Sequence, residues 1–356
     1  MFLDFSERIQ WLVAEAVLLS EPNRMGMRFG IISTANFAQV ALIPAIRKAG
    51  HEVTAIGSRD RSRAEAVADR FGIERAYGSY EALFEDDTIE AVYNPTPHSE
   101  HAKWSMRAAD HGLHVLCEKP MAVSADEARE MADHCEAAGV VLMEALMYRY
   151  HPRTERAVEI VETEFDEVRS VTGSFHGYRS RDTKLDPELK RGSLLEIGCY
   201  PITAAKGFLG VPDRVYAEVS DSLGYGLDTD TRALLAYPNG VTAHVSSSFD
   251  STHREHYRVD ATNGWLVVEE AYAPSPRSAP DGVDPVETTL RYRVDGREGV
   301  ETFEPVDQFA LEVEHFVECI SEGRTPRTDG HSAVDTLRIC DAILESGNRG
   351  TPVYLA

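Results

Sequence analysis

Lysine is scarce in this chain. Of its 36 basic residues only six are lysine, at positions 48, 103, 119, 184, 190 and 206, against 59 aspartates and glutamates, so the formal net charge is −23. Such a surface repels phosphate groups and disfavours nucleic-acid binding. It also repels itself in dilute buffer, and salt screens that repulsion. Many carboxylates and very few lysines are typical of a halophilic protein adapted to molar salt. This composition indicates where the protein works and not what it does.

Cysteine and long apolar runs are also rare. The five cysteines are odd in number and widely spaced, which disfavours a disulfide framework and a zinc site and indicates a cytoplasmic protein. No run approaches the roughly 18 apolar residues that span a bilayer, so we expect no membrane partner. The apolar stretch Trp11–Ser20 contains Glu15 and follows no basic leader, which favours an N-terminal extension, residues 1–24, over a secretory signal.

Strand and helix patterns alternate in the first part of the chain, and 356 residues accommodate two domains. The alternation predicts a doubly wound parallel sheet in a Rossmann domain of residues 25–146. Two capping boxes, Ser62-x-x-Glu65 and Ser124-x-x-Glu127, predict the starts of two intervening helices. The predicted strands are Phe29–Ile32, Val53–Gly57, Arg75–Tyr77, Ala91–Asn94, His114–Cys117 and Val140–Met143.

The pattern changes after about residue 150. Five segments rich in β-branched and aromatic residues, several of them joined by Asn-Gly turns, predict a mainly antiparallel sheet in a second α/β domain, residues 147–356. Helical patterns follow at Asp307–Ser321 and Ser332–Glu345, and Pro274–Pro285 has the composition of an exposed loop. The five segments are Val168–Phe175, Val215–Val219, Arg232–Tyr237, Thr242–Ser248 and Trp265–Glu269.

The first strand is followed by a candidate dinucleotide-binding turn. Ser33, Ala35 and Ala38 occupy the places of the small residues in G-x-G-x-x-G/A, where the backbone approaches a pyrophosphate at a helix N-terminus. With two glycines missing, an ordinary strand–helix turn explains this window equally well. The residues expected to bind the cofactor here are Ser33, Thr34, Ala35, Asn36 and Phe37.

The end of the second strand bears on the choice of cofactor. An NAD enzyme places a carboxylate there for the ribose 2′-hydroxyl, whereas this strand ends in Ser58 and Arg59. An arginine suits the 2′-phosphate of NADP. Arg63 is a second candidate, although an exposed helix residue fits equally well, and Asp60 is interpreted as a solvated surface charge. We therefore expect NADP, with NAD as the alternative.

The segment Glu118-Lys119-Pro120 follows the fifth strand, and ligands of such sheets bind beyond the carboxyl ends of the strands. The triplet resembles the hallmark of the glucose–fructose oxidoreductase, inositol dehydrogenase and rhizopine-catabolism family. The sequence is most similar to its branch of NADP-dependent D-xylose dehydrogenases and dihydrodiol dehydrogenases, from about Met27 to the C-terminus. Further segments match in order: Tyr77–Leu83, Tyr93–His101, Glu144–His151, Leu185–Leu189, Gly192–Tyr200, and Asp307–Phe309 with the helix Glu312–Ile320.

The resemblance implies a catalytic lysine at Lys119 and an acid/base residue at Tyr200. A tyrosine with an ordinary pKa of about 10 is a poor base at neutral pH. The Lys119 ammonium and an oxidised nicotinamide would both lower that pKa. Glu196, where relatives carry aspartate, would bind a sugar hydroxyl or orient Tyr200. The resemblance also implies cofactor contacts at Asn94, Pro95, Thr96, Pro97, His98, His101, Glu118, Lys119, Glu144 and Arg149.

Other interpretations of these residues stay open. The pair His98-x-x-His101 lacks further ligands for a zinc set, so no metal is expected. Arg149 either lines the cleft or is a structural hinge residue. Lys190-Arg191 departs from the glycines common in this branch, which either reshapes substrate entry or forms a charged surface loop.

The resemblance implies a reaction as well: oxidation of an aldose, D-xylose or a similar sugar, at its anomeric carbon to a lactone, with NADP reduced. The alternatives are a trans-dihydrodiol dehydrogenase, a sugar–sugar oxidoreductase with a tightly bound cofactor, a redox-assisted glycosidase and a non-catalytic NADP-binding regulator. An open second sheet is also implied. One of its faces would cover the nicotinamide cleft, and the other would form the interface of a homodimer or homotetramer.

Overall fold

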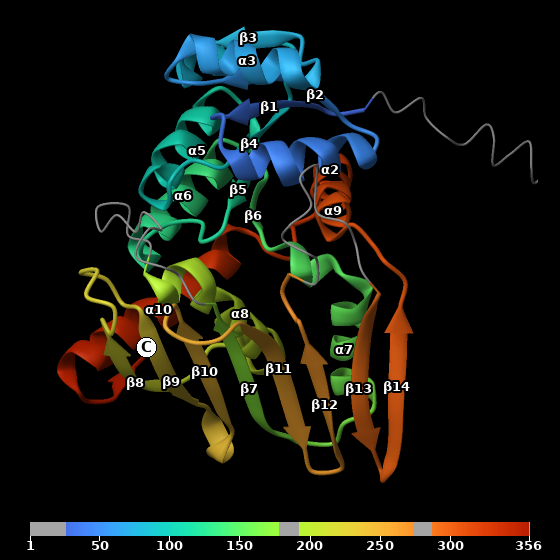
Figure 1. The fold of residues 1–356 in the computed structure, drawn as a ribbon, viewed down its shortest axis with the longest axis vertical. Helices are drawn as coiled ribbons and strands as arrows, with labels where there is room; N and C mark the ends of the chain where they lie inside the picture. The colour runs from blue at the N-terminus through green and yellow to red at the C-terminus, as the bar shows by residue number, and fades with distance from the viewer. Residues whose placement is uncertain (1–25, 178–191, 274–286, 356) are drawn as a thin grey trace, which may run out of the picture.

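The computed structural model describes residues 26–177, 192–273 and 287–355. Four sequence-based interpretations lie outside these residues: the N-terminal extension, the loop Pro274–Pro285, the segment Leu185–Leu189 and the Lys190-Arg191 pair. Figure 1 shows two sheets, with the earlier part of the chain forming the upper one and the later part forming the lower one.

The upper sheet contains six parallel strands in the order β3-β2-β1-β4-β5-β6, which confirms the predicted doubly wound architecture. Its central strands are almost wholly buried, because helices cover both faces of a parallel sheet. Five of the six predicted strands are correct to within one residue at each end. The strands are β1 (Arg28–Ile32), β2 (Glu52–Gly57), β3 (Arg75–Tyr77), β4 (Ala91–Asn94), β5 (His114–Glu118) and β6 (Leu142–Ala145).

Strand β6 begins two residues later than predicted. The Val140 N–H donates to the Cys135 carbonyl at 3.1 Å, so Val140 belongs to the end of helix α6 (Ala125–Ala137). The start of the same helix is as predicted, because the Ser124 hydroxyl accepts from the Glu127 N–H at 3.3 Å. The predicted Ser124 cap is therefore confirmed, while the Glu127 carboxylate accepts from the Val123 N–H at 2.8 Å, one residue before the position that a capping box uses.

Helix α3 (Arg61–Phe71) begins two residues earlier than a Ser62-x-x-Glu65 capping box requires, so that prediction is wrong. The cap is Asp60, whose carboxylate accepts from the Ser62 N–H at 2.9 Å. Asp60 is thus a helix cap at the surface. The other helical segments of this domain are η1 (Ala38–Leu42), α2 (Ile43–Lys48), α4 (Tyr80–Phe84), η2 (His98–Glu100) and α5 (His101–Asp110).

The second sheet has nine strands in the order β14-β13-β12-β11-β7-β10-β9-β8-β15. Every pair is antiparallel except β7 with β10, which confirms the prediction of a mainly antiparallel sheet. The strands are β7 (Val168–His176), β8 (Arg214–Ser220), β9 (Asp230–Ala236), β10 (Thr242–Ser248), β11 (Arg254–Ala261), β12 (Gly264–Glu269), β13 (Thr288–Val294), β14 (Arg297–Phe303) and β15 (Val353–Tyr354).

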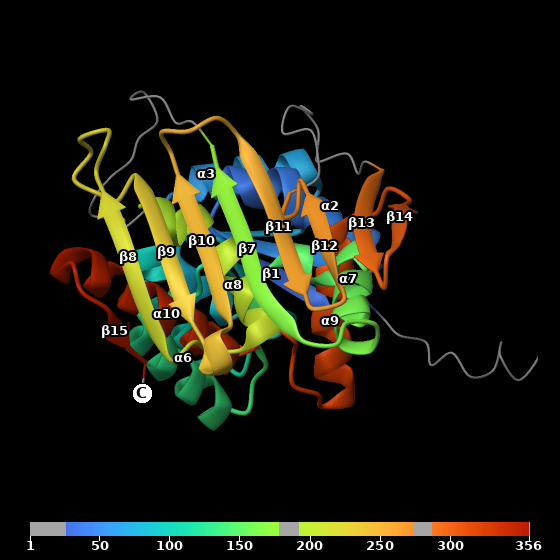
Figure 2. The same cartoon turned by 90° about the horizontal axis from the view of Figure 1, so that it is seen from below.

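Helices lie against one face of the second sheet, and Figure 2 shows the opposite face toward the viewer with α8 and α10 behind it. Helix α10 also packs on α6, and α9 packs on α2, so both helices join the two sheets. No helix within the described residues is long and apolar enough to cross a membrane. The helical segments are η3 (Met147–Tyr150), α7 (Pro152–Thr163), η5 (Leu194–Gly198), α8 (Cys199–Leu209), η6 (Pro238–Gly240), α9 (Gln308–Glu322) and α10 (Gly330–Arg349).

A buried arginine fixes the chain that leaves β12. Arg153, only 2% exposed, donates to the carbonyl of Glu269 at 3.0 Å and to those of Glu270 and Ala271 at 2.8 and 3.4 Å. These bonds hold a sharp turn, because Glu270 has a φ of +48°. Since Ala273, a few residues further on, lines a cavity between the two sheets, Arg153 supports the wall of that cavity from behind.

We predict that Arg153→Lys lowers the free energy of unfolding by about 3 kcal/mol, because one ammonium cannot reach the carbonyls that the planar guanidinium binds. Urea unfolding in concentrated KCl measures the loss. The control is Arg169→Lys, whose side chain is 54% exposed beside Glu167. The control should change the free energy by less than about 0.5 kcal/mol. Equal effects of the two substitutions would contradict the assigned role of Arg153.

Candidate active site

A cavity of about 570 Å³ lies at the carboxyl edge of the parallel sheet, between that sheet and the second domain. Ligands bind at this edge in open α/β sheets. The residues of the first domain that line it are Ala35, Asn36, Phe37, Val40, Pro95, Thr96, His98, Glu118 and Lys119. Those of the second are Met147, Phe175, Glu196, Ile197, Tyr200, Ala273, Gln308 and Phe309. Both domains therefore contribute to one site.

The turn after β1 has the backbone geometry that a dinucleotide requires. Ser33 has a φ of +92°, in the left-handed region that glycine favours, and its N–H donates to the Gly57 carbonyl at 3.0 Å. Ala35, Asn36 and Phe37 then line the cavity immediately before η1. The first N–H groups of a helix have no partner within the helix and suit a phosphate. Thr34 supports this turn, because its carbonyl accepts from the Gln39 side chain at 3.0 Å.

The end of β2 lies beside that turn. Ser58 is buried, and its hydroxyl accepts from the Asp60 N–H at 3.2 Å. Arg59 is exposed, and its guanidinium partly offsets the rise that burial causes in the pKa of Tyr80. Arg63 faces solvent and lies 3.7 Å from the Asp60 carboxylate. Arg59 is therefore the arginine nearer to the end of β2, and Arg63 already has a carboxylate beside it.

The segment after β4 divides into lining and supporting residues. Pro95, Thr96 and His98 line the cavity, whereas Asn94 and His101 are fully buried behind it. The Asn94 side chain donates to the His101 carbonyl at 3.1 Å and accepts from the Thr96 hydroxyl at 2.7 Å. The His101 ring nitrogens lie 2.7 and 2.9 Å from the carbonyl oxygens of Thr96 and Pro120. These contacts hold the β4 loop against the loop that carries the lysine.

Three further residues expected at the cofactor do not line the cavity. The Pro97 carbonyl accepts from the Glu100 N–H at 2.8 Å, at the start of η2. Glu144 is buried, and its carboxyl group accepts from the Met121 N–H at 2.9 Å. Arg149 packs so closely on α8 that a Cβ added at Gly207 would lie 2.2 Å from its guanidinium. This packing favours the interpretation of Arg149 as a structural residue over its interpretation as a residue that lines the cleft.

Lys119 joins the two domains. Its Nζ donates to the Glu196 carbonyl at 2.9 Å and lies 5.2 Å from the centre of the Tyr200 ring. Glu196 belongs to the π-helical segment η5, a conformation often found at functional sites. That segment is anchored at its start, because Asp228 accepts from the Leu194 N–H at 2.7 Å. The sequence-based prediction that Lys119, Glu196 and Tyr200 share one site agrees with this geometry.

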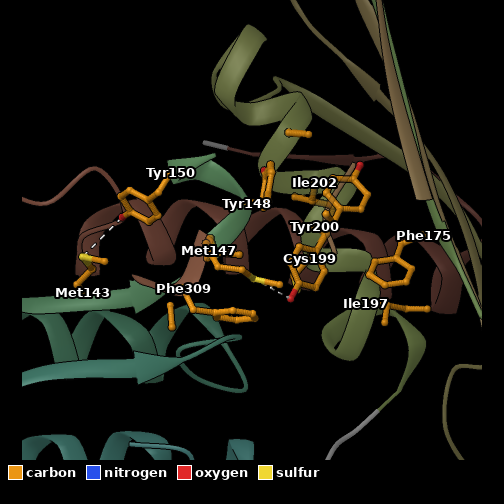
Figure 3. Packing of buried hydrophobic residues seen from close by; sticks show 14 of the residues in the cluster. Met143, Met147, Tyr148, Tyr150, Phe175, Ile197, Cys199, Tyr200, Ile202 and Phe309 are labelled. Carbon is orange, nitrogen blue, oxygen red and sulfur yellow. Dashed lines mark hydrogen bonds between the residues drawn. The ribbon is translucent and has the colours of Figure 1, made fainter. Parts of the chain in front are cut away.

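Tyr200 is 5% exposed and surrounded by aromatic rings (Figure 3). Its hydroxyl lies 3.7 Å from the Met147 sulfur, and its ring centre is 5.4 Å from those of Phe175 and Tyr272. Burial raises the pKa of Tyr200 well above its ordinary value. In the protein without cofactor the net effect is therefore a raised pKa, and the lowering expected from Lys119 and an oxidised nicotinamide together stays a prediction for the protein with cofactor bound.

Glu196 faces the first domain. Its carboxylate lies 3.5 Å from Nε2 of His98, and both side chains line the cavity. Because the Glu196 carboxylate lies next to His98, this contact does not support the expectation that Glu196 orients Tyr200. A polar wall of Glu196 and His98 suits the hydroxyl groups of a sugar, the other expected role of Glu196.

A cluster of buried carboxyl groups lies behind Lys119. The Tyr93 hydroxyl donates to Glu118 at 2.6 Å. Glu312 is 1% exposed. Burial raises the pKa of Glu312 well above its ordinary value, and the charges of Glu118 and Glu144 add to the rise. Burial therefore favours the protonated form of Glu312.

Sequence reasoning missed several residues of the site. It did not single out Val40, Met147, Phe175, Ile197, Ala273, Gln308 or Phe309 as lining residues, or Glu312 as a buried acid. The matched segments were the available signal, since a segment shared with a family of enzymes is a candidate for the site: Met147 lies in Glu144–His151, Ile197 in Gly192–Tyr200, and Gln308 and Phe309 in Asp307–Phe309. No group of three or more metal-binding side chains occurs in the described part of the chain.

Comparison with known proteins identifies the family. Residues 27–146 match the GFO/IDH/MocA model, described as an oxidoreductase family with an NAD-binding Rossmann fold, and residues 155–267 match the GFO/IDH/MocA C-terminal domain. A D-xylose 1-dehydrogenase (NADP(+)) from Haloferax volcanii is 47% identical over 333 residues, which cover 92% of this chain and all of that protein. The chain belongs to the GFO/IDH/MocA oxidoreductase family.

Other members of this family extend the comparison. A trans-1,2-dihydrobenzene-1,2-diol dehydrogenase from Mus musculus is 32% identical over 70% of this chain and 77% of its own length. An aldose–aldose oxidoreductase from Caulobacter crescentus, solved with glycerol, superposes with a TM-score of 0.83 at 26% identity and covers 93% of this chain and 100% of that one. A 3-ketoreductase from Actinomadura kijaniata, solved with NADP and TDP-benzene, gives 0.80 at 28% identity over 90% of this chain and 98% of that one.

We predict that Glu312→Gln makes the stability less sensitive to pH. In the unfolded chain Glu312 loses its proton near its ordinary pKa of 4.5, whereas the folded protein retains it to higher pH. Rising pH therefore favours the unfolded state, by up to about 1.4 kcal/mol per pH unit from this group. Glutamine does not ionise, so the free energy of unfolding of the variant should rise relative to that of the wild type as the pH increases above about 5.

Urea unfolding at several pH values measures this difference. Glu314→Gln is the matched control, because Glu314 is exposed on the same helix. It should leave the pH dependence of the wild-type chain unchanged. The same pH dependence in both variants would mean that Glu312 is ionised in the folded protein.

Proposed function

We propose that this oxidoreductase oxidises an aldose, with D-xylose as first choice, at its anomeric carbon to the lactone, using NADP as the hydride acceptor. The observation that carries the proposal is the meeting of Lys119, Tyr200 and Glu196 in one cavity at the carboxyl edge of the Rossmann sheet. The choice of D-xylose and NADP is supported by the Haloferax dehydrogenase, which the chain matches over that protein's full length.

The residues present fit a dinucleotide. The positive φ of Ser33 brings the backbone close to the cavity, and the helical turn that begins at Asn36 offers N–H groups to a pyrophosphate. Ser58 and Arg59 at the end of β2 suit a 2′-phosphate, which supports NADP over NAD. When bound, the oxidised nicotinamide accepts the hydride, and its positive charge favours the deprotonated form of Tyr200.

The chain's own groups handle the proton. Oxidation breaks the C1–H and O–H bonds of the sugar and forms a C=O bond, so the hydroxyl proton needs an acceptor. We assign this role to the Tyr200 oxygen, with the Lys119 ammonium above the ring stabilising its negative charge. In the protein without cofactor the phenol keeps its proton because it is buried. Oxidation should therefore be favoured at alkaline pH.

The second candidate function is a sugar–sugar oxidoreductase that retains its cofactor. The specific observation in its favour is the structural similarity to the Caulobacter aldose–aldose oxidoreductase. A non-catalytic regulator is disfavoured because Lys119 and Tyr200 are both present at the cavity.

We further propose that the enzyme works in the cytoplasm at molar salt as a homodimer or homotetramer. The net charge of −23 and the Haloferax relative support the salt requirement. Tyr216 on β8 is exposed between the buried Val215 and Ala217, so it lies on the face of the second sheet turned away from α10, and this face offers a surface for a second copy.

Absorbance at the NADPH band tests the proposal directly. The purified chain in roughly molar KCl would be mixed with NADP or NAD and a panel of pentoses, hexoses, polyols and dihydrodiols. Reduction of NADP by D-xylose or a related aldose supports the dehydrogenase. Bound NADP that is reduced by one sugar and reoxidised, without leaving the protein, as a second sugar is reduced supports the sugar–sugar oxidoreductase. Activity only on dihydrodiols would overturn the proposal.

We predict that Tyr200→Phe and Lys119→Met each lower kcat at least about 100-fold, because each removes part of the proton-accepting pair. The dissociation constant of NADP should change less than about threefold, as measured by fluorescence titration. Tyr148→Phe is the control, since it removes a hydroxyl bonded to Thr203 in the same aromatic cluster. Wild-type turnover in either catalytic variant would remove that residue from the mechanism.

We predict that Arg59→Ala weakens NADP binding at least about tenfold and leaves NAD binding nearly unchanged. The reason is that only NADP carries the ribose 2′-phosphate that the Arg59 guanidinium would bind. Arg63→Ala is the matched control on the neighbouring helix, where Arg63 already pairs with Asp60. An equal loss for both cofactors in Arg59→Ala would contradict the assignment of the 2′-phosphate.

A further inference from the structure

The first residue of α9, Gln308, is held rigidly at the wall of the cavity. It is 5% exposed, and its Nε2 donates to the Tyr272 carbonyl at 3.3 Å. The helix start is fixed by Asp307, whose carboxylate accepts from the N–H groups of Phe309 and Ala310 at 3.1 and 3.2 Å. Because the hydrogen bond to Tyr272 fixes the orientation of the amide group, the position of the Gln308 Oε1 is also fixed.

That oxygen has no hydrogen-bond partner among the described residues, although it is buried. A buried amide carbonyl without a partner is unfavourable by an amount comparable to a lost hydrogen bond, and such groups are rare in folded proteins. Because Gln308 lines the active-site cavity, a ligand in that cavity is the natural donor.

The surroundings of Gln308 indicate which part of a ligand it meets. On one side its partner Tyr272 packs against the catalytic Tyr200, with ring centres 5.4 Å apart. On the other side Phe309 makes an edge contact with Phe37, at 5.7 Å, in the turn after β1. Gln308 therefore lies between the acid/base residue and the pyrophosphate-binding turn, where the nicotinamide end of the cofactor fits. The candidate groups for sugar hydroxyls, Glu196 and His98, belong to other elements.

We propose that Oε1 of Gln308 accepts a hydrogen bond from the carboxamide NH₂ of the nicotinamide. This bond fixes the rotation of the ring about its glycosidic bond and so selects the face that meets the sugar. Gln308 is a cofactor-binding residue in this account. The inference rests on the proposed use of a nicotinamide cofactor.

The test compares NADP with its 3-acetylpyridine analogue, in which a methyl ketone replaces the carboxamide and no N–H donor remains. Both are titrated into the wild-type protein and into Gln308→Met, an unbranched side chain of similar volume, by isothermal calorimetry in concentrated KCl. The wild-type protein should bind NADP about tenfold more tightly than the analogue. The variant should lose about tenfold for NADP and little for the analogue, which removes the preference.

Gln39→Leu is the matched control. Gln39 donates to the Thr34 carbonyl on the pyrophosphate side of the site, so its loss should weaken NADP and the analogue equally. Equal losses for both ligands in Gln308→Met would overturn the inference, and so would a wild-type protein without preference, a result that requires no variant. A wild-type protein that binds neither ligand would refute the proposed function itself.

Discussion

The site depends on one contact between the domains, the hydrogen bond from the Lys119 ammonium to the Glu196 carbonyl at 2.9 Å. Lysine is rare in this acidic chain, and here its charge meets a backbone dipole exposed by the π-helical segment η5. The same segment leads directly into α8, whose second residue is Tyr200. A change in the geometry of η5 would therefore move the lysine partner, the acid/base residue and the Glu196 side chain together.

Burial sets the protonation states around this contact. Tyr200 and Glu312 are both enclosed by apolar or like-charged neighbours, so burial raises the pKa of each and favours its protonated form. Lys119 lies beside Glu118, whose carboxyl group also accepts a hydrogen bond from Tyr93. In the protein without cofactor the site thus holds an ammonium and a phenol, an arrangement suited to donating a proton. For Tyr200 to act as a base instead, the site requires the positive charge that an oxidised nicotinamide brings.

The sequence predicted the parallel sheet well because its strands are continuous apolar runs separated by capped helices. Strands β11, β13 and β14 were missed because charged side chains alternate along them; in β11, for example, Arg258 lies between the buried Tyr257 and Val259. The identities of Lys119, Glu196 and Tyr200 came from family motifs, whereas the rise that burial causes in the pKa of Tyr200 was not foreseen. Proximity to a cation was visible in the sequence, but the burial of the hydroxyl and the position of the ammonium over the ring depend on three-dimensional packing. Gln308 and Glu312 were missed for the same reason.

The central claim is a direct hydride transfer from the sugar's anomeric carbon within this cavity. The most direct measurement uses D-xylose deuterated at C1, with NADP, and follows the label by mass spectrometry and NMR of the reduced cofactor. The account predicts that deuterium appears at C4 of the nicotinamide on one face only, together with unlabelled lactone and a slower rate of the chemical step. Reduced cofactor without deuterium, or label lost to water, would contradict direct transfer and with it the assigned roles of Lys119 and Tyr200.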